Sequence, residues 1–147
     1  MLILIDSLYI DNEFDEKFFS SLINNISKFI EFNLAAELSI VLTDDTSIAE
    51  LNAQYRGKSR PTDVLSFPMD DDIMLGDIVI SLDTARKQAE EVDIPLKREV
   101  AFLFIHGFLH LMGFDHEDKN GNEAPEDAEE MFSLQEEILA DWVNEYE

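Results

Sequence analysis

Residues 100–112 are the segment that most constrains what this chain can fold into. Twelve of these thirteen positions, from Val100 to Met112, hold apolar residues or histidine, the remaining one is Gly107, and the apolar side chains fall on every side of a helical wheel. A helix that is apolar all round must be buried, so the rest of the chain has to cover it from several directions. His106 and His110 lie inside this segment, which places titratable groups on a buried helix.

The remaining segments predict a layered fold. Four β-rich apolar stretches, at 2–5, 36–42, 64–67 and 77–82, are typical of short strands. Helical spacing of apolar residues predicts helices over 14–30, from the capping cluster 44–47 to about 54, over 83–91, from Pro95 onward and from Pro125 onward. Ser47 and Glu50 have the spacing of a capping box, and 69–76 reads as an acidic, glycine-containing connection.

The predicted order is therefore strand, helix, strand, helix, strand, strand and three helices. This order indicates an α+β fold, with a small mixed sheet of about four strands packed with about five helices. With 147 residues, 46% of them apolar, the chain can fill one core, so we expect a single domain over 1–147. The pattern does not predict the order of strands in the sheet.

Cysteine usage and the N-terminus limit the possible sites and locations. The chain has no cysteine, so a metal ion would be held by His, Asp or Glu, and disulfides are excluded. The first ten residues lack a basic region and are interrupted by Asp6 and Ser7, unlike a signal peptide. No stretch reaches the roughly 20 apolar residues of a membrane span. We expect a soluble cytoplasmic protein with no membrane partner.

The formal net charge of −23 at first disfavours nucleic acid as a partner. The charge is unevenly distributed, however. From Asp115 to the C-terminus there are 13 acidic residues and one basic residue, Lys119, whereas Arg56, Lys58 and Arg60 cluster within five positions. The acidic run is either a solvated helix face or a functional surface. The three basic residues either cluster by chance or form a phosphate-binding loop.

All three histidines of the chain fall within eleven residues. His106 and His110, four residues apart, lie about 40° apart around a helix and can share one ion. His116 would face away on a continuous helix, but Gly113 offers a place for the helix to end and the chain to fold back. Three protein ligands with one open position are typical of catalytic zinc. The alternative is that these are hydrogen-bonded core histidines, but one cation satisfies two buried imidazoles more readily than separate partners do.

The histidine spacing also matches the zincin pattern H-E-x-x-H-x-x-G-x-x-H, with Gly107 at the position of the catalytic glutamate. Glycine cannot accept a proton, which disfavours peptide hydrolysis. A metal ion that lowers the pKa of a bound water toward about 7 can still supply hydroxide.

Three blocks in the same order resemble the bacterial YbeY family: NAQYRGKSRPTDVLSFP (52–68), LGDIVIS (75–81) and HGFLHLMGFDH (106–116). The resemblance implies a zincin-like α+β fold and an endoribonuclease that cuts single-stranded RNA. It also implies a role in maturation of the 3′ end of 16S ribosomal RNA and in ribosome quality control. The expected partners are ribosomal RNA, the small ribosomal subunit and its assembly factors, with no DNA.

Carried over to this sequence, the resemblance implies that His106, His110 and His116 bind one Zn²⁺ or another divalent transition metal. It places the arginine that the family holds near the metal on Arg56. Phe114 stands where the family commonly has tyrosine, which excludes a phenolic hydroxyl there.

The residue types fit these roles. The planar guanidinium of Arg56 suits phosphate oxygens and developing negative charge, although an ion pair with a carboxylate is the alternative. Lys58 and Arg60 would steer the RNA strand. Asp115 either accepts a hydrogen bond from a ligand imidazole and orients it or is a surface acid. We expect Thr62, Asp63, Ser66 and Asp77 to be structural or to line a cleft.

Two other functions compete with the nuclease. A zincin-type metalloprotease is favoured by the histidine spacing and opposed by Gly107. A non-catalytic ribosome assembly factor would use the metal structurally and its acidic surface to bind a basic ribosomal protein.

Overall fold

The computed structural model describes residues 1–9, 13–57, 60–69, 71, 73–114 and 125–147. The elements follow the predicted order, and their bounds are β1 (Leu2–Ser7), α1 (Glu16–Ile26), β2 (Glu37–Thr43), α2 (Asp45–Arg56), β3 (Val64–Pro68), β4 (Met74–Ser81), α3 (Leu82–Val92), α4 (Leu96–Leu111) and α5 (Pro125–Tyr146). Among these described residues, four strands form one mixed sheet and five helices pack around it, which confirms the predicted α+β class.

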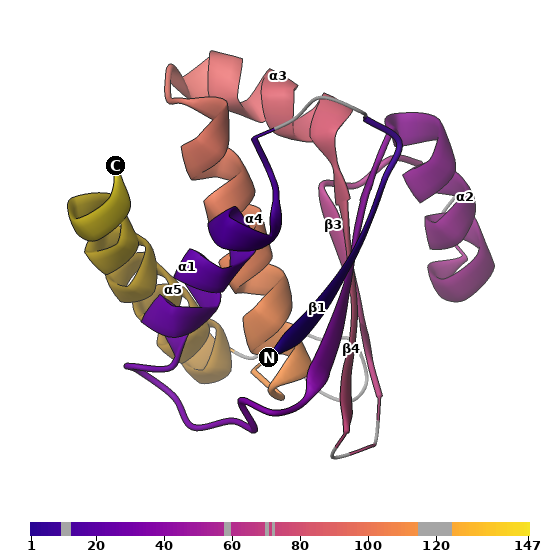
Figure 1. Cartoon of the computed structure of the whole chain (residues 1–147). Coiled ribbons are helices and arrows are strands. Elements are labelled where there is room, and N and C mark those ends of the chain that lie inside the picture. Colours follow the sequence, from indigo (N-terminus) through magenta and orange to yellow (C-terminus); the bar gives the residue numbers. More distant parts are fainter. Residues whose placement is uncertain (10–12, 58–59, 70, 72, 115–124) are drawn as a thin grey trace.

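The sheet has the order β1-β2-β4-β3, so β1 and β3 are its edge strands. β1, β2 and β4 are parallel, and β3 pairs antiparallel with β4. Figure 1 shows α1, α4 and α5 on one side of the sheet, α2 on the other, and α3 across the end at which β2 and β4 finish. The helix α4 and the helix α2 therefore flank the same sheet from opposite faces.

Side chains alternate between these two faces, as the pleat of a strand requires. Leu38, Ile40 and Leu42 of β2 point into the main core with α1, α4 and α5, whereas Val41 packs with Ile48 of α2 in a smaller core. Ten of the sixteen residues of α4 are buried, which confirms that the apolar segment forms a covered helix.

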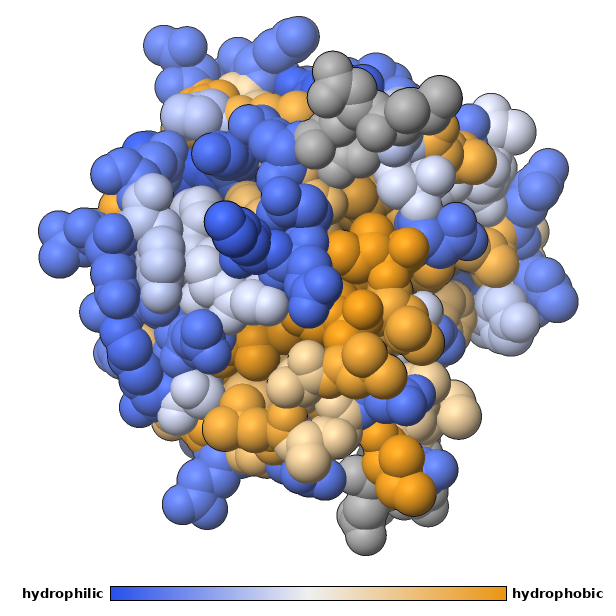
Figure 2. Space-filling model, viewed as in Figure 1, coloured by the Kyte–Doolittle hydropathy of each residue, from blue (hydrophilic) through white to orange (hydrophobic). Residues whose placement is uncertain are grey.

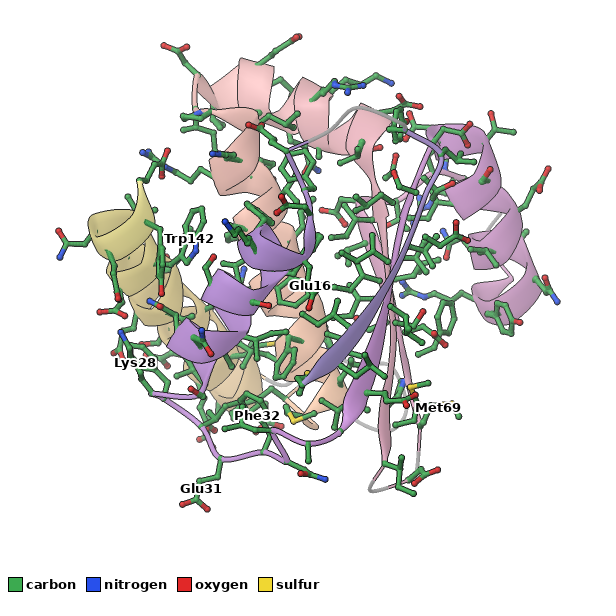
Figure 3. All side chains as sticks on the ribbon, in the orientation of Figure 1. Glu16, Lys28, Glu31, Phe32, Met69 and Trp142 are labelled. Carbon is green, nitrogen blue, oxygen red and sulfur yellow. The ribbon has the colours of Figure 1, made fainter. Side chains whose placement is uncertain are left out.

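α5 packs on α4 and α1 and completes the cover. The indole of Trp142 donates a 2.9 Å hydrogen bond to the hydroxyl of Ser21 on α1, and Lys28 pairs with Asp141 and Glu145 on α5. Trp142 and Lys28 are labelled along this seam in Figure 3. These contacts join α5 to α1, while α5 also packs on the histidine-bearing helix α4.

The structure differs from the prediction at three boundaries. α1 ends at Ile26, before the last apolar residues of its stripe. α2 begins at Asp45, within the predicted capping cluster 44–47, but the cap is Asp44, whose carboxylate accepts the amide of Ser47 at 2.8 Å, so the capping box on Ser47 is wrong. β4 begins at Met74, and Gly76 lies inside it at φ +142°, where a Cβ would collide with the carbonyl oxygen of Phe67.

One exposed surface is apolar. The outward side chains of the edge strand β1, Leu2 and Leu4, are exposed, and Figure 2 shows a hydrophobic band crossing the middle of this face. Among the described helices, none is both long and apolar enough to cross a bilayer.

Candidate functional site

The last two turns of α4 present His106 and His110 side by side. Both are half-buried, and their immediate neighbours on the helix are buried. Their Nε2 atoms are 3.1 Å apart, and their ring centroids are 4.6 Å apart. Tetrahedral ligands at about 2.0–2.1 Å from zinc would be about 3.3–3.4 Å from each other, so this spacing fits two ligands of one ion. The C-terminal end of the helix dipole also favours a cation beside His110.

α5 holds the ring of His106 from two directions. The Gln135 side chain, 1% exposed, directs its amide oxygen to within 2.9 Å of Nδ1. Phe132 stacks on the imidazole face, with centroids 6.3 Å apart and an interplanar angle of 18°. Because Nδ1–H donates to Gln135, Nε2 carries the lone pair and faces His110.

Sequence reasoning missed Gln135. It recognised the apolar residues of the α5 inner face but not the one amide among them. Gln135 lies four residues after Met131 and three before Ile138, which places it on the buried face of the helix. A buried amide needs a hydrogen-bond partner, and this requirement could have indicated a polar contact at Gln135.

The predicted end of α4 at Gly113 is confirmed. Gly113 has φ +95°, and its amide donates to His110 O at 3.1 Å, while the amide of Phe114 donates to Leu109 O at 3.0 Å. These two bonds form a Schellman motif, in which glycine tolerates the left-handed backbone. The other two candidates of this block, Asp115 and His116, lie outside the described residues. Within the described part of the chain, no group of three possible metal ligands occurs.

A groove of about 630 Å³ follows the edge strand β3 between α2 and α4. His106 and His110 line it on the α4 side, and Tyr55 and Arg56 line it on the α2 side. Arg56 is the last residue of α2, which ends there because Gly57 takes up φ +70°. The structure therefore brings Arg56 and the histidine pair into one groove, although 50 residues separate them in sequence.

The other candidates divide between the groove and its surroundings. Thr62, Asp63 and Ser66 line the groove, whereas Asp77 lies within β4. Arg60 is exposed and is not among the lining residues, and its carbonyl oxygen accepts a 2.9 Å bond from the Asn52 amide. Lys58 lies outside the described residues.

The alternative role of Arg56 was an ion pair. The ion pairs found between described residues involve Lys28, Lys87, Lys97 and Arg98, and none of them involves Arg56. The exposed Arg56 side chain is therefore available to a ligand in the groove.

Gly107 is the point at which α4 touches the sheet. A Cβ on Gly107 would lie 3.0 Å from Ile78 Cγ2, 3.0 Å from Ser66 Oγ and 3.3 Å from Val64 Cγ2. The Ser66 hydroxyl also donates to Gly107 O at 3.1 Å. A Cβ at this position would be in tight contact with three side chains of the sheet, so the packing disfavours the general base of a zincin protease there.

Comparisons with known proteins show the family of the chain. Residues 5–143 match the sequence model of the family described as endoribonuclease YbeY. The chain belongs to the YbeY family of endoribonucleases.

Similar proteins cover most of the chain. The endoribonuclease YbeY of Persephonella marina is 45% identical over 143 residues, which cover 93% of this chain and 90% of the relative. That of Bacillus subtilis is 43% identical over 117 residues, covering 71% of each. The solution structure of TM1509 from Thermotoga maritima matches with a TM-score of 0.62 and 30% identity, covering 99% of this chain and 94% of that one.

The match to the YbeY family confirms the resemblance that the sequence showed and the predicted enzyme class, a hydrolase that acts on RNA. It does not favour the metalloprotease or the non-catalytic assembly factor.

Proposed function

We propose that this chain is a zinc-dependent endoribonuclease that cuts single-stranded ribosomal RNA. The observation that carries the proposal is that one groove contains Arg56 and two imidazoles whose Nε2 atoms are 3.1 Å apart. By analogy with the family, the reaction matures the 3′ end of 16S ribosomal RNA and contributes to ribosome quality control.

His106 and His110 would hold the ion through Nε2, with His116 as the third protein ligand. A bound Zn²⁺ supplies Lewis-acid chemistry at a phosphodiester. Gln135 and Phe132 orient His106, and the wall formed by β3 and α4 positions the RNA backbone beside the pair.

Arg56 would bind the non-bridging oxygens of the scissile phosphate. Its guanidinium is planar, carries several donors and keeps its charge, so it can stabilise the negative charge that grows in the transition state. Lys58 and Arg60 would add salt-sensitive contacts farther along the strand, and Asp115 would support a ligand imidazole.

The proposed substrate also implies where the enzyme acts and which particles it contacts. Ribosomal RNA is encountered on the small ribosomal subunit with its assembly factors, so the proposal places the protein in the cytoplasm and in contact with those particles. Residues 1–147 would form a single metal-dependent hydrolase domain.

The test uses the wild-type chain, His110→Ala, Arg56→Ala and Arg86→Ala. Arg86 is an exposed arginine on α3, 5.5 Å from the Tyr9 ring, and it is the control for loss of one positive charge. Metal content is measured for each protein, and each is incubated with single-stranded and duplex RNA with and without chelator.

We expect His110→Ala to lose both zinc and cleavage. Arg56→Ala should keep zinc but cleave about 10²–10³-fold more slowly, because one transition-state donor is removed. Arg86→Ala should behave as wild type. A wild-type protein that contains zinc but cuts no RNA would refute the proposed activity, and full cleavage by Arg56→Ala would refute the role of Arg56.

A further inference from the structure

An exposed aromatic side chain lies in the same groove as the histidines. Tyr55 projects from the last turn of α2 and is 59% exposed. Its ring centroid is 4.9 Å from that of Phe67 on β3, with an interplanar angle of 59°. Tyr55 and Phe67 both line the groove that contains His106 and His110.

Core packing explains Phe67 but not the position of Tyr55. Phe67 is half-buried and packs against the small core of Ile48, Leu65 and Val79. Tyr55 touches the edge of this core and leaves most of its surface in solvent. Within the described part of the chain, no hydrogen bond to its hydroxyl occurs. Its ring contacts Phe67, and the rest of its surface is open to a planar ligand.

Because the protein is strongly acidic, a contact with RNA that does not depend on charge would contribute to its affinity. The net charge of −23 repels RNA at a distance, and among the described residues Arg56 is the only lysine or arginine that lines the groove. Phosphate contacts alone therefore give little affinity. Stacking of a base on an aromatic ring does not depend on charge and contributes affinity at any net charge.

We propose that Tyr55, supported by Phe67, is a stacking platform for one unpaired nucleobase of the substrate. The inference rests on the proposed ribonuclease function and deepens it. Arg56 follows Tyr55 directly in the chain, so the platform would hold a base next to the phosphate that Arg56 binds. Bases in a duplex are already stacked on their neighbours, so only a single strand can offer a free face to Tyr55, which gives a physical basis for single-strand preference.

Binding is measured with the full chain treated with chelator, so that the RNA stays intact. The probe is a single-stranded RNA oligonucleotide carrying one 2-aminopurine, whose fluorescence falls on stacking, and a duplex of the same sequence serves for comparison. Tyr55→Leu keeps an apolar side chain against Phe67, Tyr55→Phe keeps the ring, and Tyr146→Ala is the matched control. Tyr146 is 47% exposed on α5 and stacks on Trp142 outside the groove.

We expect Tyr55→Leu to lose about tenfold in affinity for the single strand and to lose the fluorescence change. The loss should be the same at low and high salt, whereas the loss in Arg56→Ala should shrink as salt rises. Tyr55→Phe and Tyr146→Ala should bind within about twofold of wild type.

Two results overturn the platform. In the first, Tyr55→Leu is folded by circular dichroism and binds the single strand as tightly as wild type, and the wild-type protein cleaves RNA. This result refutes the stacking platform but not the proposed nuclease activity. The second is a wild-type protein that neither binds nor cleaves RNA, which refutes both.

Discussion

The His106 side chain shows how one residue can depend on a helix that is distant in sequence. Gln135 accepts its Nδ1–H at 2.9 Å, and this fixes the tautomer whose Nε2 can bind a metal. An orienting partner of a ligand histidine typically changes metal affinity by about 10–100-fold.

We therefore expect Gln135→Leu to bind zinc about 10–100-fold more weakly than wild type, and Gln135→Glu to retain binding because it still accepts the proton. Affinity is measured by competition with a chromophoric chelator. Asn25→Leu is the matched control, since Asn25 is also a buried amide at the α5 interface but touches no histidine. Equal zinc affinity for Gln135→Leu and wild type would contradict this role.

Glu99 is a buried acid on α4 that the proposed reaction does not use. It is 8% exposed, and burial, together with the negative charge of Asp63, raises the pKa of its carboxyl above the usual value. A pKa raised in the folded state favours the protonated form, so its contribution to stability is present at low pH and is lost as the pH rises through the folded pKa.

Glu99→Gln should therefore unfold at higher urea concentration than wild type at pH 8, and the difference should disappear near pH 4. Glu136→Gln, an exposed substitution on α5, is the control and should change little at either pH. A Glu99→Gln protein less stable than wild type at pH 8 would show that the carboxylate is stabilised by its surroundings.

Among individual residues, those whose positions depend on local spacing along the chain could be predicted from the sequence. The His106 and His110 pair follows from the helical period, and the break at Gly113 from the backbone freedom of glycine. The burial of Gln135 could be read from its place on the apolar stripe of α5, but its contact with His106 and the contact of Tyr55 with Phe67 could not, because no local pattern specifies which elements pack together.

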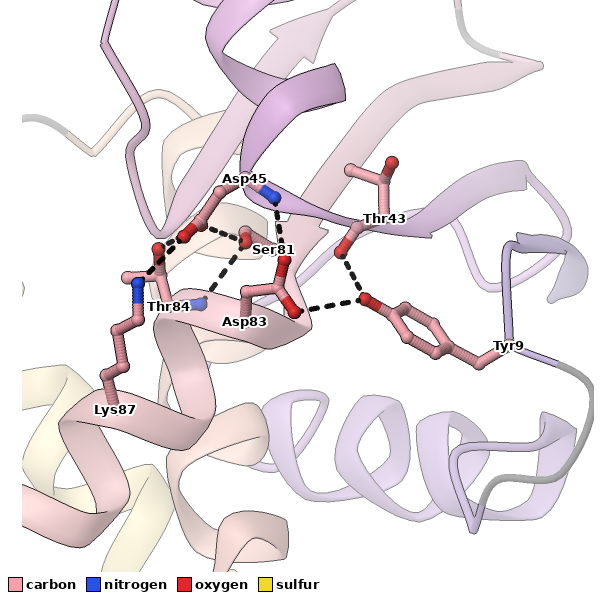
Figure 4. Close-up of polar contacts among 7 residues, drawn as sticks. All are labelled: Tyr9, Thr43, Asp45, Ser81, Asp83, Thr84 and Lys87. Atoms are coloured by element: carbon pink, nitrogen blue, oxygen red, sulfur yellow. Dashed lines mark hydrogen bonds and ion pairs between the residues drawn. The ribbon is translucent and has the colours of Figure 1, made fainter.

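Between elements, a polar cluster joins the start of α2 to α3 (Figure 4). The Asp45 carboxylate accepts hydrogen bonds from Ser81 Oγ at 2.7 Å and Thr84 Oγ1 at 2.5 Å, and pairs with Lys87 at 3.2 Å. Burial raises the pKa of Asp45, but the bonds from Thr84, Ser81 and Lys87 outweigh it and hold the pKa below the usual value.

Asp45→Ala should lower the free energy of unfolding by about 1–3 kcal/mol at pH 7, because two hydroxyls lose their acceptor. A lowered pKa means that this contribution is present above the unfolded pKa and is lost as the pH falls through the folded value, so the difference from wild type should shrink below about pH 4. Urea unfolding at pH 7 and pH 3 checks both points, with exposed Glu137→Ala as the control. A difference that is constant with pH would exclude the carboxylate as its source.

Element order was predictable, whereas strand order was not. Periodicity identifies a strand and its buried face but not its partner. Nothing local to residues 64–68 states that β3 pairs antiparallel with β4 at an edge, yet that placement opens the groove on β3. The extra residues of β4, from Met74, were missed because Gly76 reads locally as a turn residue.

At the scale of the whole molecule, the 33 acidic residues against 10 basic ones dominate. Self-repulsion of a net charge of −23 opposes the compact state and is screened by salt. We expect the melting temperature to rise by about 3–5 °C between low and near-physiological ionic strength, corresponding to about 1 kcal/mol for a chain of this size. Thermal unfolding followed by circular dichroism at several NaCl concentrations measures this, and a melting temperature that falls with salt would mean that attractive pairs such as Lys28 with Glu145 outweigh the repulsion.

The contact at Gly107 has a consequence for the width of the groove. Because Gly107 has no side chain, α4 packs closely on the side chains of Ile78, Ser66 and Val64 in the sheet. A larger residue at 107 would require these side chains to shift, and we expect it to move the turn that carries the imidazoles away from Ser66. The smallest side chain of α4 would thus limit how closely the imidazoles can approach the strand that lines the groove.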